Sequence, residues 1–232
     1  MSFSKRWIII FLSLLLSVGI IGCSTNTTAT EEGSEQDNSE SNRIDSGAQL
    51  GGLNVGMTAQ PPTLDTHMST AIASTYVMRQ VFESLLTVNS QYEVVPDLAE
   101  SVEESKDGLT YTFKLRENVY FHNGKELTSE DVVASLNRWK DTSPVGVSQI
   151  IKDGSFEAVE PYTVKLHLNS PSALALPILA ANRYASIMPK EVIEEADETG
   201  VKAYIRTGPF KFVEWKQDQY IHLKKYEAYS PV

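Results

Sequence analysis

The chain has 232 residues, of which 41% are hydrophobic and 22% are charged, and its formal net charge is −10 at pH 7. This composition is typical of a soluble globular protein and excludes a collagen, a polytopic membrane protein and a wholly disordered chain. The acidic balance argues against nucleic acid as a partner, because a phosphate backbone requires a basic face. The single cysteine excludes an intramolecular disulfide framework and a cysteine-rich zinc site.

Residues 1–22 have the layout of a secretory signal peptide. Lys5 and Arg6 form a positively charged head, and an apolar run follows from Trp7 to Ile21. This run is shorter than the roughly 20 residues that a membrane-spanning helix needs. The alternative is an N-terminal anchor that stays uncleaved. We predict that residues 1–22 are an export signal.

The only cysteine closes this apolar run, directly after Ile20, Ile21 and Gly22. The four residues resemble the lipobox of bacterial lipoproteins. The resemblance implies cleavage after Gly22 and attachment of a diacylglyceryl group to the thiol of Cys23, and a doubly acylated N-terminus is stably anchored in a membrane. The alternative is a buried cysteine that happens to end the signal peptide. We predict Cys23 as the lipid attachment site, on the extracytoplasmic face of the bacterial cell membrane.

Residues 24–50 are rich in Ser, Thr and Glu and contain very few apolar side chains. Such a segment cannot bury enough apolar surface to offset the entropy lost on ordering. We therefore expect residues 23–50 to form a lipidated, disordered acidic tether, with an acidic interaction tail as the alternative. The folded part is then expected to span residues 51–232.

The folded part opens with a short apolar strand predicted at residues 53–57, which Pro61 and Pro62 end. Apolar residues then repeat at helical spacing over residues 74–86, with Ser74 or Thr75 as the N-cap. Strict alternation of apolar and polar residues over 109–116 predicts a half-buried strand. The dipeptide at 123–124, Asn-Gly, predicts a tight turn.

The next segments predict helices and strands in alternation. Thr128 and Asp131 are spaced as the two members of a capping box, and they predict a helix that begins after Thr128. Two helices are expected at residues 172–181, where Pro177 bends or shortens the helix, and at 189–197. Two strand pairs are expected at residues 156–160 with 163–168 and at 210–215 with 220–225. This mixture predicts an α/β or α+β mixed sheet instead of an all-β sandwich.

No catalytic or metal-binding motif is visible in the sequence. The four histidines are scattered, and none has a second His or a Cys at ligand spacing. The patterns G-x-S-x-G and S-x-x-K and the P-loop are missing from the part of the chain that follows the predicted export signal. The adjacent acidic pairs at 103–104 and 194–195 are interpreted as solvated, and His122 as part of a turn. We therefore predict neither an enzyme nor a bound cofactor or metal.

Three segments together resemble one family. The longest lies within residues 99–132 and includes D-G-L-T-Y-T-F-K-L-R and V-Y-F-H-N-G, ending in L-T-S-E-D-V. The second is T-G-P-F-K-F at 207–212, followed by Trp215 and Tyr229, and the third runs from L-D-T-H at 64–67 to F-E-S-L-L at 82–86. These segments are similar to the extracytoplasmic solute-binding proteins of peptide and nickel ABC transporters, and they cover nearly all of residues 53–232.

The resemblance implies the first lobe of a two-lobed, periplasmic-binding-protein-like fold. Members of this family hold the ligand in the cleft between the lobes, and much of the affinity for peptides comes from main-chain pairing, a form of strand addition. The position of the loop after the first strand points to five ligand-binding residues: Ser69, Thr70, Ala71, Ile72 and Ala73. The turn at 207–209 is expected to be structural.

The function that the resemblance implies is capture of an oligopeptide or dipeptide outside the membrane and delivery to an ABC permease, by hinge closure without a chemical step. Family members are much longer than this chain, so the second lobe is expected to be absent. Two alternatives stay open: a nickel chelate or another small solute as the ligand, and a truncated remnant with no role in transport.

Overall fold

The computed structural model describes residues 51–143, 153–181 and 185–229. The predicted signal peptide, Cys23 and the tether lie outside these residues. The chain divides into two compact units, Met1–Leu53 and Asn54–Val232, and every element described below belongs to the second. Within the described ranges, no helix has the length and apolar character needed to cross a membrane.

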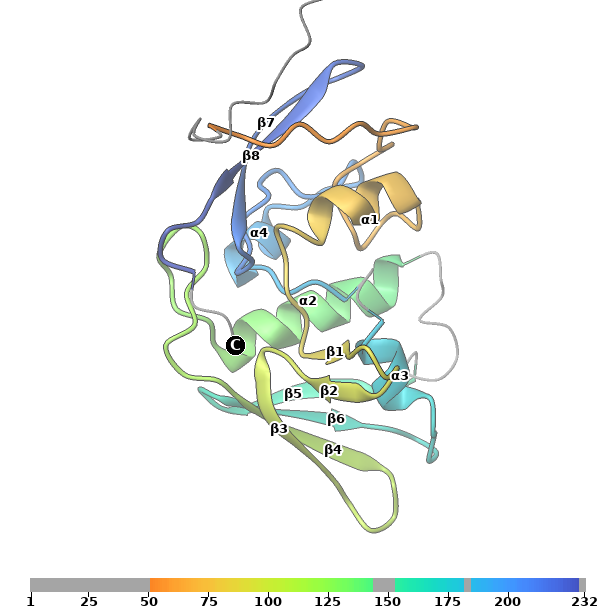
Figure 1. Cartoon of the computed structure of the whole chain (residues 1–232). Coiled ribbons are helices and arrows are strands. Elements are labelled where there is room, and N and C mark those ends of the chain that lie inside the picture. Colours follow the sequence, from red (N-terminus) through yellow and green to blue (C-terminus); the bar gives the residue numbers. More distant parts are fainter. Residues whose placement is uncertain (1–50, 144–152, 182–184, 230–232) are drawn as a thin grey trace, which may run out of the picture. The chain divides into compact units, whose positions relative to one another are not determined.

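A four-stranded antiparallel sheet is the largest sheet of the second unit (Figure 1). Its spatial order is β3-β4-β6-β5, formed by β3 (Ala99–Glu104), β4 (Thr110–Leu115), β5 (Ser155–Glu160) and β6 (Thr163–His167). The alternation predicted for β4 is confirmed, because Tyr111, Phe113 and Leu115 are buried whereas Lys114 is exposed. The predicted hairpin of β5 and β6 is also confirmed.

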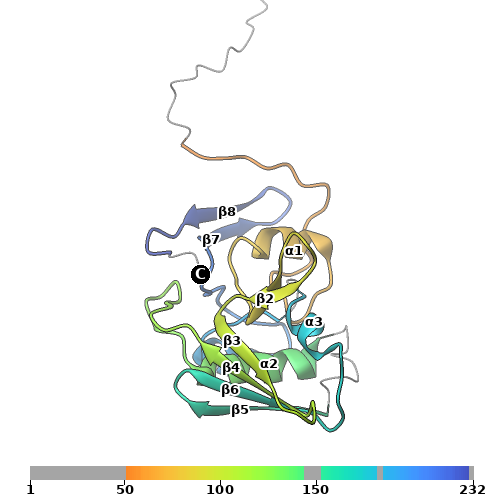
Figure 2. The same cartoon turned by 60° about the horizontal axis from the view of Figure 1, so that its bottom comes forward.

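One long helix, α2 (Ser129–Thr142), packs against this sheet (Figures 1 and 2). The predicted capping box is confirmed: Thr128 is the N-cap, and its N–H donates to the Asp131 carboxylate at 3.0 Å. The buried face of the helix carries Val132, Leu136 and Trp139. The helix therefore begins where its sequence satisfies the free N–H groups of a first turn.

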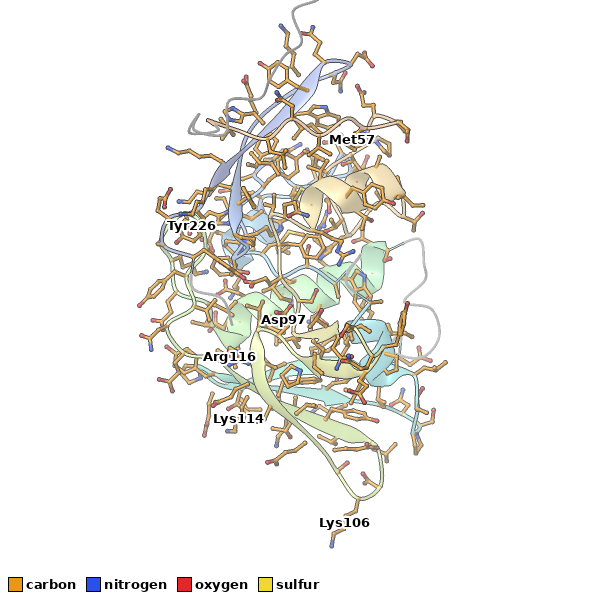
Figure 3. All side chains as sticks on the ribbon, in the orientation of Figure 1. Met57, Asp97, Lys106, Lys114, Arg116 and Tyr226 are labelled. Carbon is orange, nitrogen blue, oxygen red and sulfur yellow. The ribbon has the colours of Figure 1, made fainter. Side chains whose placement is uncertain are left out.

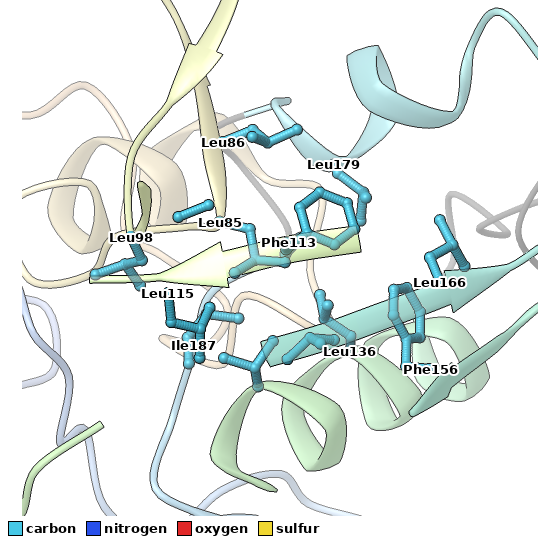
Figure 4. Close-up of a cluster of buried hydrophobic side chains, with 14 of the residues drawn as sticks. Leu85, Leu86, Leu98, Phe113, Leu115, Leu136, Phe156, Leu166, Leu179 and Ile187 are labelled. Carbon is cyan, nitrogen blue, oxygen red and sulfur yellow. The ribbon is translucent and has the colours of Figure 1, made fainter. Parts of the chain in front are cut away.

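The main hydrophobic core combines side chains of the four-stranded sheet and α2 with those of a smaller two-stranded sheet (Figure 4). The small sheet pairs β1 (Leu86–Val88) with β2 (Val94–Pro96). Phe113, Leu136 and Leu86 are each at most 1% exposed. Burial of a side chain of this size contributes roughly 1.5–3 kcal/mol, so this cluster is the principal source of stability.

A second hydrophobic cluster lies between α1 (Ile72–Met78) and the hairpin of β7 (Phe210–Lys216) and β8 (Tyr220–Lys225). Val77 and Met78 of α1 are buried, and Phe212, Trp215 and Leu223 of the hairpin pack against their cluster. The strand pair predicted at the C-terminal side is thus confirmed. The packing joins a helix and a hairpin that are far apart in the sequence.

Two predictions on the N-terminal side are wrong. Residues 53–57 form no strand, and Leu53 is 87% exposed. The helix predicted over residues 74–86 is α1, which begins after Ala71 and ends at Met78. It ends early because the Gln80 and Val81 carbonyl groups accept hydrogen bonds from the distant Phe210 and Gly208 N–H groups, at 3.0 and 2.9 Å.

The two remaining helices are shorter than predicted. The first, α3 (Ala175–Leu179), contains Pro177, in keeping with the expected shortening. The second, α4 (Lys190–Glu194), follows Pro189 as its N-cap. The structure confirms a mixed α/β fold, in which helices and antiparallel strands pack together in a main hydrophobic core and in smaller clusters beside it.

Candidate functional site

The five predicted ligand-binding residues form the 69–73 loop, which runs into the first turn of α1. The structure brings them together, with a buried base and an exposed tip. Ser69 is 8% exposed, whereas Thr70 is exposed and Ile72 is 59% exposed. Tyr76, one turn further along α1, is 65% exposed. An uncharged surface with two exposed apolar side chains therefore faces solvent at this end of α1.

The base of the loop is fixed by Asp65, which is 1% exposed. Its two carboxylate oxygens accept hydrogen bonds from Nη1 and Nη2 of Arg138 on α2, at 3.1 and 2.6 Å. They also accept the His67 and Val201 N–H groups, each at 3.0 Å. Burial by itself would raise the pKa of Asp65, but Arg138 and the other partners hold it below its ordinary value. Asp65 therefore stays ionised and joins three segments of the chain.

His67 adds a second fixed point beneath the loop. It is fully buried, and its Nε2 donates to the Ser186 carbonyl group at 2.9 Å. The preceding Thr66 shares a hydrogen bond of 2.6 Å with the Ser186 hydroxyl. Burial lowers the pKa of His67 to about 3, so its ring is neutral at physiological pH.

The loop is tied to α1 by short side chains. Ser69 Oγ accepts the Ala71 N–H at 3.1 Å and lies 3.4 Å from the Ser74 hydroxyl, which in turn donates to the Thr63 carbonyl group. These are local contacts that Ser residues favour in turns. They hold the loop on a rigid support, as a binding site requires.

The tip of the loop keeps main-chain groups available. The N–H groups of Thr70 and Ile72 and the carbonyl group of Thr70 make no hydrogen bond to any residue of the described ranges. Ala71, between them, has a φ of −64° and a ψ of 129°, which is an extended conformation. Extended main chain with free donors and acceptors is what strand addition needs.

The turn at residues 207–209, predicted to be structural, packs against the end of α1. Gly208 lies so close that a Cβ on it would be 2.6 Å from the carbonyl carbon and oxygen of Val81. The ring of His122 donates from Nε2 to the Gly208 carbonyl group at 2.9 Å, and Lys211 Nζ donates to the His122 carbonyl group at 2.7 Å. His122 therefore fixes this turn.

A pocket of about 250 Å³ lies at the C-terminal end of α1, lined by Arg79, Phe82, Glu83, Ser84, Asp97, Pro209 and Tyr229. Glu83 is 9% exposed, and its carboxylate accepts the Tyr229 hydroxyl at 3.0 Å. Asp97 follows β2, and its main-chain carbonyl group accepts Nε of Arg116 at 2.8 Å (Figure 3). The sequence supplied no signal for this pocket, because its residues come from four separate segments, at 79–84, 97, 209 and 229.

The comparisons with known proteins agree with this fold. Residues 93–231 match the family model described as bacterial extracellular solute-binding proteins, family 5 Middle. The oligopeptide-binding proteins OppA and AppA of Bacillus subtilis (strain 168) are 28% and 30% identical to the chain, over 97% and 93% of its length. The chain spans only 43% and 40% of the length of these two relatives.

Solved structures show the same likeness. The structure of AppA from Bacillus subtilis in complex with a nonapeptide has a TM-score of 0.65 and 31% identity, and it covers 73% of this chain and 35% of that one. The structure of NikZ from Campylobacter jejuni in complex with Ni(L-His) has a TM-score of 0.63 and 29% identity. It covers 74% of this chain and 34% of the NikZ chain. These shares fit one lobe of a two-lobed fold. The chain belongs to family 5 of the bacterial extracellular solute-binding proteins.

Proposed function

We propose that this protein is the substrate-binding component of an ABC importer, which captures peptides outside the cell membrane and delivers them to the permease. The observation that carries the proposal is the 69–73 loop, with its free main-chain groups on a buried support of Asp65 and His67. The similarity to AppA, solved with a nonapeptide, supports a peptide as the ligand.

Binding in this proposal is main-chain pairing without a chemical step. The N–H groups of Thr70 and Ile72 donate to the ligand backbone, and the Thr70 carbonyl group accepts from it. The exposed Ile72 side chain contacts an apolar part of the ligand. In this proposal, the opposing wall of the cleft corresponds to the part of the relatives with which this chain does not align.

A nickel chelate or another small solute is the second candidate, supported by the similarity to NikZ in complex with Ni(L-His). A remnant without a role in transport is the third. The three candidates differ in what the full chain binds: peptides in the first, a metal chelate in the second and neither in the third.

The test removes one main-chain donor. Ile72 is the first residue of α1 and follows an extended Ala71, so proline is tolerated there and deletes only the N–H group and part of the side chain. We expect Ile72→Pro to weaken the binding of a mixed nonapeptide library to the full chain by roughly tenfold, the value of one hydrogen bond, measured by calorimetry.

Ile72→Ala is the matched control, because it shortens the same side chain and keeps the N–H group, and its affinity should exceed that of the proline variant. Equal affinities in the two variants would contradict main-chain pairing at this residue. Binding of Ni(L-His) in place of peptides would favour the second candidate. Binding of neither ligand would favour the third.

We also propose that Cys23 carries the lipid that anchors the protein at the outer face of the cell membrane. The support is its position at the end of the apolar run. Replacing Cys23 with Ala should move the protein from the membrane fraction to the soluble fraction on ultracentrifugation, whereas Ser24→Ala should leave it membrane-bound. Retention of the Cys23→Ala variant in membranes would refute the anchor.

A further inference from the structure

The pocket at the C-terminal end of α1 takes no part in the proposed peptide site, which lies at the other end of the helix. Among its seven lining residues, Arg79 is basic, whereas Glu83 and Asp97 are acidic. Phe82 and Pro209 supply apolar surface, and Tyr229 and Ser84 supply hydroxyl groups. A volume of about 250 Å³ has room for a small organic molecule and its hydration.

The opposite charges of the pocket do not neutralise one another. In the part of the chain that the structure describes, the Arg79 guanidinium group has neither a hydrogen bond nor an ion pair. The Glu83 carboxylate accepts the neutral Tyr229 hydroxyl, and the Asp97 carboxylate accepts the Ser84 N–H group at 3.1 Å. A basic group and two acidic groups thus share one pocket without an ion pair between them, and Asp97 also interacts with the charge of Arg116, which lies outside the pocket lining.

The Glu83 carboxylate has neutral donors beside it and, among the described residues, no cation. The Tyr229 hydroxyl donates to it, and the buried Thr207 hydroxyl lies next to it. Burial, followed by the negative charge of Asp97, raises the pKa of Glu83 to about 7. A buried carboxylate is normally balanced by a cation, and no residue of the described ranges forms an ion pair with Glu83.

We propose that this pocket binds a small zwitterion of the size of a free α-amino acid, with its ammonium group on Glu83 and Asp97 and its carboxylate on Arg79. The ammonium group supplies a cation beside Glu83 and adds to the charge of Arg116 at Asp97. The carboxylate pairs with the guanidinium group, whose planar donors match it. The Tyr229 hydroxyl, which donates to Glu83 at 3.0 Å, completes the hydrogen bonding of Glu83 on the protein side.

The experiment titrates the full chain with L-alanine by calorimetry. We expect binding in the millimolar range, as for a ligand with few atoms. Methylammonium and acetate, which each carry one of the two charges, should bind at least about tenfold more weakly. Arg79→Gln, at an exposed residue whose loss does not endanger the fold, should weaken L-alanine binding about tenfold or more, the value of one charged hydrogen-bonded pair.

Lys106→Gln is the matched control, because Lys106 is an exposed basic residue at the tip of the β3–β4 hairpin, remote from the pocket (Figure 3). It should leave L-alanine binding unchanged. Ile72→Pro should also leave it unchanged, which separates this site from the peptide site. L-alanine binding that Arg79→Gln does not alter, or no binding at all, would overturn the proposal, as would methylammonium binding as tightly as L-alanine.

The pH dependence supplies a second measurement. Asp97 and the hydroxyl groups of Thr207 and Tyr229 act on the pKa of Glu83. Arg79 lines the same pocket, and the charge of Arg116 acts on Asp97. An ammonium group prefers the ionised carboxylate, so L-alanine should bind more tightly as the pH rises from about 6 to about 8. In Glu83→Gln this dependence should disappear, and its persistence would contradict the assignment of the ammonium group to Glu83.

Discussion

Glu83 is a carboxylic acid that folding places beside Asp97 and among buried neutral groups. Its pKa is raised to about 7, first by burial and then by the charge of Asp97, from an ordinary value of 4.5. A raised pKa means that the folded state binds the proton more tightly than the unfolded state does. The stabilisation is therefore fully present below about pH 4.5 and is lost as the pH rises through about 7.

The corresponding prediction is that Glu83→Gln stabilises the protein at pH 8 by about 2–3 kcal/mol, since glutamine keeps an acceptor for Tyr229 and cannot ionise. Denaturant unfolding at pH 5 and pH 8 measures this, and the gain should fall to less than about 1 kcal/mol at pH 5. Glu103→Gln, at an exposed strand residue, is the control and should change little at either pH. A destabilised Glu83→Gln at pH 8 would contradict the argument.

At the scale of single elements, the sequence predicted well those features that depend on near neighbours. The alternation of β4 and the capping box of α2 each involve residues within a few positions, and both are present. The end of α1 was mispredicted because Val81 and Phe82 have helical spacing but bond and pack against residues 208–223 instead. Long-range contacts override a local pattern at that point.

In the candidate site, too, the contacts between distant residues were not predicted from the sequence. The five residues of the 69–73 loop were predicted from a family resemblance and stay a prediction, whereas the support beneath them was not predicted. Asp65 and Arg138 are 73 positions apart, and no spacing rule relates them. The only sequence signal for Asp65 was its place in the L-D-T-H segment. The sequence therefore pointed to the loop that we propose as a binding site, but not to the ion pair that holds this loop in place.

At the scale of the whole chain, Gly208 joins segments that are 127 positions apart, since its N–H donates to the Val81 carbonyl group at 2.9 Å. A Cβ on Gly208 would lie 2.6 Å from the same group, and backbone cannot move aside cheaply. We expect Gly208→Ala to destabilise the protein by about 3 kcal/mol or more.

Thermal or denaturant unfolding measures this loss. Gly56→Ala is the control, because a Cβ on Gly56 would meet nothing within 4 Å, and its stability should equal that of the unchanged protein. If both glycine variants were equally stable, the contact between the 207–209 turn and the end of α1 would not hold the two parts together.

The hydrogen bonds beneath the 69–73 loop can form only late in the synthesis of the chain. The hydrogen-bond partner of Asp65, the Val201 N–H group, is synthesised 136 residues after it. Ser186, the partner of His67, is synthesised 119 residues after it. At a synthesis rate of roughly 5–20 residues per second, the first delay is about 7–27 s. The residues proposed to bind ligand are therefore synthesised early, but their supporting hydrogen bonds form only after residues 186 and 201 have been added. A nascent chain stopped before residue 186 would contain all five of them and neither of these two partners.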